Sequence, residues 1–335
     1  MTSMRFATLF SLVCATGACA CTIPVFRYAL DRWEADKFHL VLPASAAKDA
    51  PLQDLLRPLR ANGKANLDIT TSTDPAVTLA QLHSSRESDQ FVWSGKLDQN
   101  SLPTLLDSPA RRQIVERILA GDSVVWVIAD NGSPEDLAEA ERIEKRLKFL
   151  QQVAALPIQD PHDPDSQLGP GPPLRLQFTT LRLRRDDPAE QPLLRMLAGP
   201  GGEVDPATTS FAAAVFGRGR VLGAWPLALM DDASLEDASM FLVGRCGCRL
   251  KNQNPGWDIL LNVDWGQVLQ TATAAAPLTT EAAAPSVPTT PEVVTISPQE
   301  TVASAVEPSS NRFFIGGIIL GAVLLVVFLI RFKKT

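Results

Sequence analysis

Cysteine is the residue type that offers this chain the most chemistry, because a thiolate can attack a substrate, bind a metal or form a disulfide. The five cysteines are Cys14, Cys19, Cys21, Cys246 and Cys248. Cys246 and Cys248 flank a single glycine that permits a tight turn, so their two sulfurs could bridge each other. A ring that short is strained, which would make it more oxidising than a structural disulfide.

Cys21 is a second partner for either member of the Cys246/Cys248 pair. The chain carries features of an exported protein, described below, and thiols outside the cytoplasm are usually oxidised. We predict that Cys21 is bonded to Cys246 or Cys248, which would join the N-terminal segment to the far end of the domain. The alternative is a redox-active arrangement, in which Cys21, Cys246 or Cys248 is the catalytic thiol. Three thiols without a nearby histidine make a poor zinc site, and we predict no metal and no cofactor.

Two further polar runs could bind ions. The Gly-Arg-Gly-Arg run at 217–220 could hold an anion through backbone N–H groups and two guanidiniums, but we favour a hairpin turn with solvated arginines. The second run contains Asp160, His162, Asp163 and Asp165. Its spacing does not match an EF-hand loop, so we favour a solvated loop over a cation site. P-loop, nucleophile-elbow, dinucleotide-binding and zinc-protease motifs are absent from the sequence.

The start of the chain indicates where these residues work. A short positive start, an apolar stretch and small residues follow one another, which is the pattern of a secretory signal peptide at 1–20. Ala18 and Ala20 fit the small-x-small rule, so we expect cleavage before Cys21, with cleavage before Cys19 as the alternative. Lipidation is less favoured, because the residue three positions before Cys19 is not Leu or Val.

The end of the chain reads as a membrane anchor. Residues 313–330 form an uninterrupted apolar run, about the shortest helix that crosses a bilayer. More cations follow this run than precede it, so we expect the tail at 331–335 in the cytoplasm and the rest outside. Gly317 and Gly321 share one helix face, which could pack against another membrane helix.

A tether is expected between the anchor and the folded part. Residues 270–311 are rich in Ala, Thr, Pro, Val, Ser and Glu and contain no aromatic residue, Lys or Arg. Prolines interrupt the stretch repeatedly. It cannot bury enough apolar surface to fold, so the composition predicts a disordered, extended linker.

Residues 21–268 have an ordinary globular composition and are expected to form an extracytoplasmic α/β domain. The net charge is −6, and no basic stripe interleaved with aromatics occurs, which disfavours nucleic acid as a partner. Strands are expected at 38–42, 65–70, 90–94, 124–129, 174–184, 211–216, 221–227 and 258–263. Helices are expected at 25–33, 51–59, 75–82, 102–119, 134–153, 192–197 and 235–243. This alternation predicts a mixed sheet with flanking helices.

Two finer features of this domain follow from the pattern. The apolar alternation within 174–184 changes phase at Thr179-Thr180, which predicts a bulge that keeps both sets of side chains on the core side. A break rich in Pro, Gly and Asp at 157–173 predicts two subdomains, 21–156 and 172–268.

The segment that follows Cys21 resembles the active-site segment of thioredoxin-like proteins. Cys21 opens a helical pattern, where the helix dipole would lower its pKa, and a strand follows at 38–42. The strand–turn–strand at 211–222 resembles a later part of that fold. The chain has no Cys three residues after Cys21 and no Pro directly before Phe211, where that fold places its cis-proline. The resemblance therefore implies a fold more than an activity.

A second resemblance extends over the whole ectodomain. Its motifs are CTIPVFRYALDRW at 21–33, FGRGR at 216–220, Cys-x-Cys at 246–248, NPGWD at 254–258 and Asp-Trp at 264–265. They resemble motifs of a family of uncharacterised exported bacterial proteins. This resemblance implies a place in the bacterial envelope and no particular activity.

These features together predict a single-pass membrane protein whose ectodomain faces away from the cytoplasm. We predict a non-catalytic binding or scaffolding module that meets the membrane and another membrane protein. The alternative is a membrane-held thiol–disulfide oxidoreductase that uses Cys21 or the Cys246/Cys248 pair.

Overall fold

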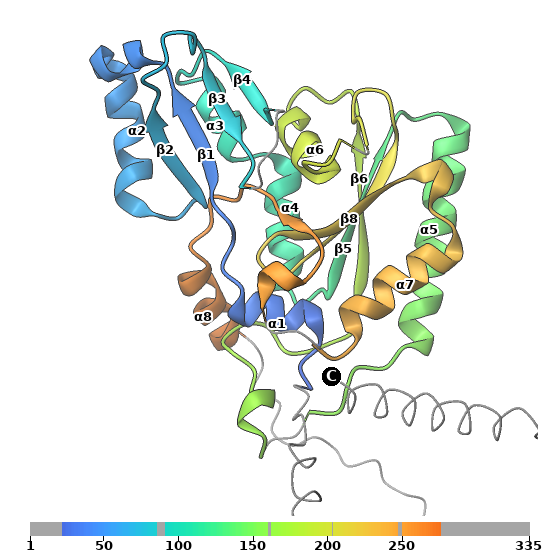
Figure 1. The fold of residues 1–335 in the computed structure, drawn as a ribbon. Helices are drawn as coiled ribbons and strands as arrows, with labels where there is room; N and C mark the ends of the chain where they lie inside the picture. Colours follow the sequence, from blue (N-terminus) through green and yellow to red (C-terminus); the bar gives the residue numbers. More distant parts are fainter. Residues whose placement is uncertain (1–21, 86–90, 160–161, 203, 247–249, 276–335) are drawn as a thin grey trace, which may run out of the picture. The chain divides into compact units, whose positions relative to one another are not determined.

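Two mixed β-sheets form the framework of the described chain (Figure 1). The computed structural model describes residues 22–85, 91–159, 162–202, 204–246 and 250–275, all within one compact unit. The expected signal peptide and membrane anchor, including Gly317 and Gly321, lie outside these ranges, as do Cys21 and Cys248. Of the helices in the described ranges, none is both long and apolar enough to span a bilayer.

The first sheet has the strand order β2-β1-β3-β4. Its strands are β1 (Phe38–Leu42), β2 (Leu67–Thr71), β3 (Ala80–His83) and β4 (Trp93–Gly95). β2 follows the helix α2 (Ala50–Asn62) and runs parallel to β1, whereas β3 and then β4 are added in antiparallel orientation. The side chains of β1 alternate, since Leu40 and Leu42 are buried with α2 and α3 (Ser101–Leu106) while His39 is exposed. This sheet therefore buries only one of its faces.

The second sheet has the strand order β6-β5-β7-β8-β9. Its strands are β5 (Val124–Asp130), β6 (Phe178–Arg184), β7 (Phe211–Phe216), β8 (Arg220–Pro226) and β9 (Trp257–Asp258). β5 and β6 are parallel and are joined through α5 (Pro134–Val153), whereas β7 and β8 form an antiparallel hairpin. All seven residues of β5 are buried. Such a continuous apolar run is typical of a strand that is covered on both faces.

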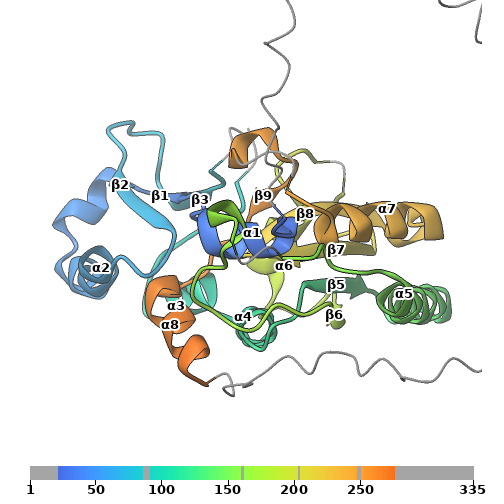
Figure 2. The ribbon, with the colours of Figure 1, turned by 90° about the horizontal axis from the view of Figure 1, so that it is seen from below.

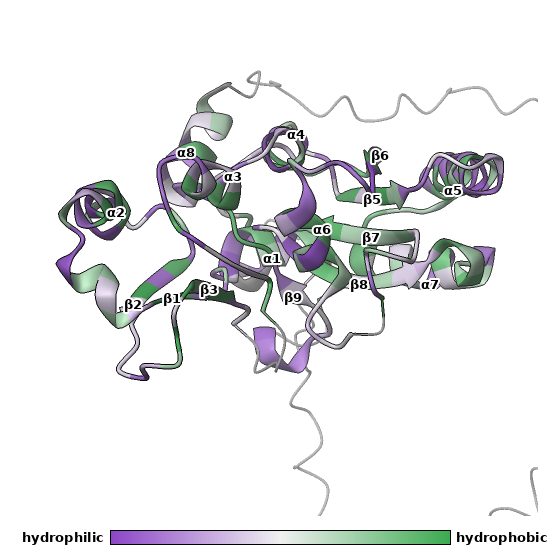
Figure 3. Ribbon diagram, turned by 90° about the horizontal axis from the view of Figure 1, so that it is seen from above, coloured by the Kyte–Doolittle hydropathy of each residue, from purple (hydrophilic) through white to green (hydrophobic). Residues whose placement is uncertain are grey.

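Helices cover both faces of the second sheet. Successive side chains of β5 point to opposite faces, so Val125 and Val127 pack with α4 (Pro109–Leu119) and α6 (Gln191–Ala198). Trp126 packs on the other side with α5, α7 (Asp232–Val243) and α1 (Val25–Arg32). Figure 2 shows α5 and α7 side by side. In Figure 3 the strands β5, β7 and β8 are mainly hydrophobic or neutral, whereas α5 also carries hydrophilic colour.

Many of the expected elements are present, with small differences at their ends. The confirmed strands include 38–42 and 124–129, and the confirmed helices include 51–59 and 134–153. Ser133 caps α5 as its position before Pro134 predicts, because its hydroxyl accepts a hydrogen bond from the N–H of Asp136 at 3.2 Å. The α/β class with mixed sheets and flanking helices is therefore confirmed.

Two expected helices are wrong in detail. Residues 75–82 do not form a helix, because Ala80 and Leu82 alternate inward on β3, between β1 and β4. The helix expected at 102–119 is divided into α3 and α4. Ser108 starts α4 by accepting a hydrogen bond from the N–H of Arg111, and Pro109 takes the first helical position, where its missing N–H costs nothing.

The bulge expected at Thr179-Thr180 is absent. β6 pairs with β5 in continuous register from Phe178 to Arg184. Phe178 enters the core on one face and Leu181 the core on the other. The phase change needs no bulge because both faces of this sheet are covered. The register shift in the sheet lies instead between Ala213 and Val215 of β7.

The last expected strand, 258–263, pairs with β8 only at β9. The chain beyond β9 crosses toward the first sheet, where Leu261 donates its N–H to the side-chain oxygen of Asn66 at 2.8 Å. A bridge between Ala65 and Asn262 continues this link. The helix α8 (Trp265–Ala275) follows, so helical structure extends into the start of the expected tether.

In the sequence, the strands of the first sheet (β1 to β4) all precede the strands of the second sheet (β5 to β9). The break at 157–173 lies between β5 and β6, which pair with each other, so it falls within one sheet. The two segments that resemble thioredoxin-like proteins lie in different sheets, because β1, the strand that follows α1, belongs to the first sheet. The hairpin β7–β8 belongs to the second sheet and lies beside β5.

Candidate functional site

The turn at 217–220 fastens α1 to the hairpin β7–β8. Gly217 has φ of 58°, and a Cβ added there would lie 2.7 Å from the Cβ of Ala29, so only glycine lets the helix approach this closely. Arg218 donates from Nε to the carbonyl oxygen of Leu30 at 2.8 Å and thereby satisfies the last turn of α1. Burial lowers the pKa of Arg218.

Arg220 is the centre of a buried polar cluster. The side chain is 3% exposed and donates to the carbonyl oxygens of Asn254 at 2.9 Å and Gly256 at 3.1 Å. Its Nη1 lies 3.3 Å from Oδ1 of Asp258. The guanidinium also sits over the ring of Trp33, 5.5 Å from the ring centroid. Arg220 therefore connects the hairpin, the NPGWD loop and the end of the α1 segment.

Asp258 is the acid of this cluster. It is 2% exposed and accepts the N–H of Asp36 at 2.5 Å, and Lys251 forms an ion pair with it. The ammonium of Lys251 also lies 2.8 Å from Asp36. Burial raises the pKa of Asp258, and the charge of Lys251 opposes that rise. We call Trp33, Arg218, Arg220, Lys251 and Asp258 the arginine cluster.

A second buried pair holds α1 to the segment before β6. Nε of Arg27 lies 2.9 Å from Oδ1 of Asp31, and both side chains are almost fully buried. Arg27 donates to the carbonyl oxygen of Gly169 at 2.7 Å, and Asp31 accepts the N–H of Gly169 at 2.8 Å. The pair completes its hydrogen bonds with backbone, which is what a buried ion pair requires.

The motifs at 21–33, 216–220 and 254–258 thus meet in space, although they are far apart in the sequence. The prediction of solvated arginines at 217–220 is wrong, because Arg218 is half-buried and Arg220 is buried. The carbonyl groups of a helix end and of a tight turn lie beside them and need donors. Both guanidiniums donate to these carbonyl groups and so help to hold the fold.

Of the candidate disulfide or catalytic cysteines Cys21, Cys246 and Cys248, only Cys246 lies within the described ranges. It is buried, and its N–H donates to the carbonyl oxygen of Ile23 at 3.0 Å. A neighbouring bridge pairs Pro24 with Arg245 in antiparallel orientation. Cys246 therefore lies beside Ile23, and Ile23 is two residues from Cys21 in sequence. The bonding of Cys21 and Cys248 stays a prediction.

The other predicted ion-binding run gives no site in the described ranges. Oδ2 of Asp163 accepts a hydrogen bond from the hydroxyl of Ser166 at 2.6 Å and orders a short turn. Among the described residues, no group of three or more His, Cys, Asp and Glu side chains is arranged to hold a metal.

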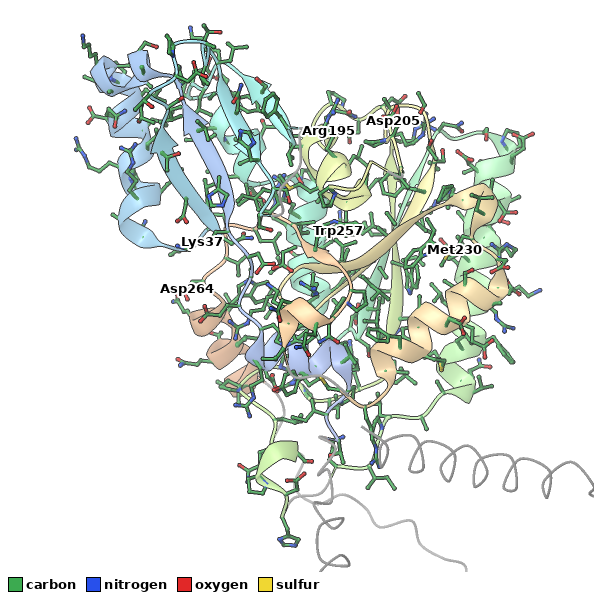
Figure 4. The ribbon with its side chains drawn as sticks, in the orientation of Figure 1. Lys37, Arg195, Asp205, Met230, Trp257 and Asp264 are labelled. Atoms are coloured by element: carbon green, nitrogen blue, oxygen red, sulfur yellow. The ribbon has the colours of Figure 1, made fainter. Side chains whose placement is uncertain are left out.

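A cleft of about 330 Å³ lies between the two sheets, next to the arginine cluster. We call it the inter-sheet cleft. Its described lining is Phe38, Ser84, Phe91, Val92, Arg195, Met196, Ala198, Gly199, Pro200, Gly202, Val204, Asp205, Pro206, Trp257 and Asp258. Figure 4 shows Arg195 and Asp205 at the top of the second-sheet half, with Trp257 below them. The volume is at the lower end of the range for small-molecule sites.

The indole ring of Trp257 is held in position by contacts within the protein. Its indole N–H donates to the carbonyl oxygen of Met196 at 2.7 Å. A Cβ added to Gly199 would lie 2.5 Å from the indole ring, so glycine makes room for it. Phe38 and Phe91 face the same cleft from the first sheet. Phe91 and Trp257 can thus contact an apolar or aromatic group above the buried Phe38, with Arg195 and Asp205 available for its polar ends.

The carboxyl ends of β5 and β6 form a second polar region. Asp130 is buried and accepts hydrogen bonds from Arg182 at 2.8 Å and from the N–H of Gly132 at 2.9 Å. Asp136 accepts the hydroxyl hydrogen bond of Ser210 at 2.5 Å. These contacts tie the start of α5 to β6 and to the entrance of β7.

The sequence reasoning missed the inter-sheet cleft. Trp257 stands in a motif that the sequence pointed to, but Phe91, Arg195 and Asp205 carry no pattern of their own. They meet only because the two sheets pack together. Comparison of the chain with protein-family models, curated proteins and solved structures gives no match.

Proposed function

We propose that this chain is a non-catalytic binding module of the bacterial envelope and that the inter-sheet cleft is its ligand site. The observation that carries the proposal is the fixed aromatic wall of the cleft. Trp257 is held by a hydrogen bond to backbone, so little conformational entropy is lost when a ligand contacts it. The predicted anchor at 313–330 would hold this module at the membrane.

A thioredoxin-like ancestry is part of the proposal. The order β6-β5-β7-β8, with α5 between the parallel strands and α7 after the hairpin, is similar to thioredoxin-like folds. Redox members of that fold class carry their thiols where the first helix begins. In this chain the turn between β5 and α5 occupies that place. Its residues are Asn131, Gly132, Ser133 and Pro134, and because none of them is a cysteine, the turn supports a binding role over thiol exchange.

We also propose that Cys21 is joined to Cys246 or Cys248 as a structural disulfide. The hydrogen bond between Cys246 and Ile23 supports this pairing, because two residues of chain reach at most about 7 Å. Mass mapping of the native protein after alkylation, without reduction, is expected to find Cys21 in a cross-linked peptide. Recovery of all these cysteines as alkylated thiols would contradict the disulfide.

The cleft is tested by photo-crosslinking in native membranes. A benzophenone amino acid replaces Phe91, which lines the cleft and is 42% exposed, or Phe149 on α5, which is 48% exposed and does not line it. The exposure of the two sites is matched, so random collisions label both. We expect a discrete adduct from position 91 alone, identified by mass spectrometry.

The proposal also makes a claim about charge at the cleft. Arg195→Ala and Asp205→Ala are both expected to weaken the position-91 adduct. Arg195→Ala should leave thermal stability unchanged because its side chain is exposed, whereas Asp205→Ala also removes two hydrogen bonds from the turn that begins at Asp205. Equal labelling from positions 91 and 149, or labelling that ignores both substitutions, would argue that the cleft is not the binding site.

A further inference from the structure

The uncovered face of the first sheet carries a row of three polar side chains. His39 of β1 lies directly opposite His83 of antiparallel β3. On its other side, His39 is paired with Asp68 of parallel β2. Directly paired residues point to the same face of a sheet, with Cβ atoms about 4.5–5.5 Å apart. The two imidazoles therefore project side by side from neighbouring strands.

This face is accessible. His39 is exposed and His83 and Asp68 are partly exposed, whereas Leu40 and Leu82, next to them in the strands, are buried on the opposite face. The chain has three histidines in all, and two of them form this pair. The third, His162, lies in the segment between α5 and β6.

One of the two imidazoles is already oriented. The ring of His83 packs edge-on against the ring of Phe91, with centroids 4.9 Å apart and planes at 88°. Burial and the neighbouring His39 both lower the pKa of His83, which favours the neutral imidazole that metals bind.

We propose that His39 and His83 form a two-imidazole binding site for a divalent transition metal. Paired imidazoles suit Cu²⁺, Ni²⁺ and Zn²⁺, and Cu²⁺ should bind most tightly in the general affinity order. Metal–nitrogen bonds of about 2.0–2.1 Å, as zinc makes, fit between two side chains whose Cβ atoms are paired across strands. The site supplies two protein ligands and leaves the other coordination positions to solvent or to a further ligand.

The charges around the site permit a cation. Asp68 is the nearest acid in the row and forms an ion pair of 2.9 Å with Lys37. Both members of that pair are largely exposed, so the pair is weak and its charges nearly cancel. The neighbouring positions on the same face, Thr70, Gln81 and Ser94, are uncharged.

Electron paramagnetic resonance of the full chain with one equivalent of Cu²⁺ tests the site. The protein is kept in detergent, and free thiols are alkylated first so that they cannot reduce or bind the copper. We expect nitrogen superhyperfine splitting from two imidazoles. His39→Gln and His83→Gln should each weaken copper binding at least about tenfold, whereas His162→Gln should not.

Comparison of the three histidine variants decides whether the copper is bound by His39 and His83. Retention of the parent signal in either His39→Gln or His83→Gln overturns the proposal, as does loss of the signal in His162→Gln. Thermal melts of the metal-free variants check folding, and His39→Gln is expected to be neutral because its side chain is exposed. The proposal does not rest on ligand binding in the inter-sheet cleft, although Phe91, which packs against His83, also lines that cleft.

Discussion

The two sheets share an order of strands but differ in what covers them. In both, a second strand lies parallel beside the first, and a third and a fourth are added antiparallel on the other side. The connection between β6 and β7 contains α6, which covers one face of the second sheet. The shorter connection between β2 and β3 contains no helix in the structure, so one face of the first sheet is open.

The difference in coverage determines which types of residue the first strand of each sheet, β1 or β5, can contain. β5 has both faces in a core and is apolar from Val124 to Ala129, whereas β1 alternates and presents His39 outward. The central strand of the first sheet can therefore carry an exposed polar residue in its middle, whereas β5 carries its one polar residue, Asp130, at its end. The same order of strands serves as a stable core in one half and as an exposed platform in the other.

The buried ion pairs of the described residues lie around the second sheet, which also carries exposed pairs such as Arg184–Asp186. The pairs Arg220–Asp258 and Arg27–Asp31 are buried and hydrogen-bonded to loops that surround the second sheet. The pair Arg57–Asp54 on α2, beside the first sheet, is exposed. Buried pairs are costly to break, and exposed pairs contribute little.

Loss of the buried arginine is expected to have the largest effect. Arg220→Ala should lower the free energy of unfolding by about 3–5 kcal/mol, because it removes one of the two cations that pair with the buried Asp258 and takes the donors from two carbonyl groups. Chemical denaturation followed by circular dichroism measures the change. Arg57→Ala is the matched control and should remain within about 0.5 kcal/mol of the parent. Similar losses of unfolding free energy in Arg220→Ala and Arg57→Ala would contradict the distinction between buried and exposed ion pairs.

Valine truncation compares the two first strands directly. Val127 of β5 is fully buried, so Val127→Ala should cost about 2 kcal/mol through lost burial and a small cavity. Val41 of β1 faces the open side and is only partly buried, so Val41→Ala should cost less than about 1 kcal/mol. Denaturant midpoints measured side by side check the order, and a larger cost at Val41 would mean that a partner covers the open face.

Titration of Asp258 should make the stability of the second-sheet half depend on pH. Burial raises its folded-state pKa, so the folded protein holds the proton to higher pH than the unfolded chain does. Its contribution to stability is present below the unfolded pKa and is lost as the pH rises through the folded pKa. Unfolding midpoints should therefore fall with rising pH in the parent relative to Asp258→Asn. Parallel curves for the two proteins would exclude this role.

Titration of His83 should make the stability of the first-sheet half depend on pH as well, more weakly and with the opposite sign. Its folded-state pKa is lowered, chiefly by burial, so the unfolded chain binds the proton more readily. The contribution to stability is present above the ordinary pKa of 6.5 and is lost as the pH falls through the folded pKa. Melting temperatures in a chelator should show a decline on acidification that His83→Gln lacks and His162→Gln retains. A decline that persists in His83→Gln would assign it to another group.

The elements that were predictable are those with strong local patterns. The run 124–129 is apolar and β-branched at nearly every position, and Ser133-Pro134 marks the start of a helix in any context. The region 75–82 was mistaken because its four-residue strand is short, and pairing with β1 and β4 outweighs local propensity there. The bulge at Thr179-Thr180 was mistaken because a sequence does not reveal that both faces of a sheet are covered.

The candidate sites were less predictable than the fold. The sequence singled out Arg218, Arg220 and Asp258 by their motifs but not their burial, since burial depends on α1 packing against the hairpin. The inter-sheet cleft gathers Phe91 and Trp257 from distant parts of the chain, and no local spacing encodes that meeting.

By itself, the sequence determined the α/β class, most helices and strands, and the positions of glycines that turns require. These properties depend on side-chain periodicity and on backbone sterics, which act over a few residues. Only the tertiary structure decided which face of each sheet is covered, which arginines are buried and which histidines stand opposite each other. Those outcomes depend on strand order and register, which join residues far apart in the chain.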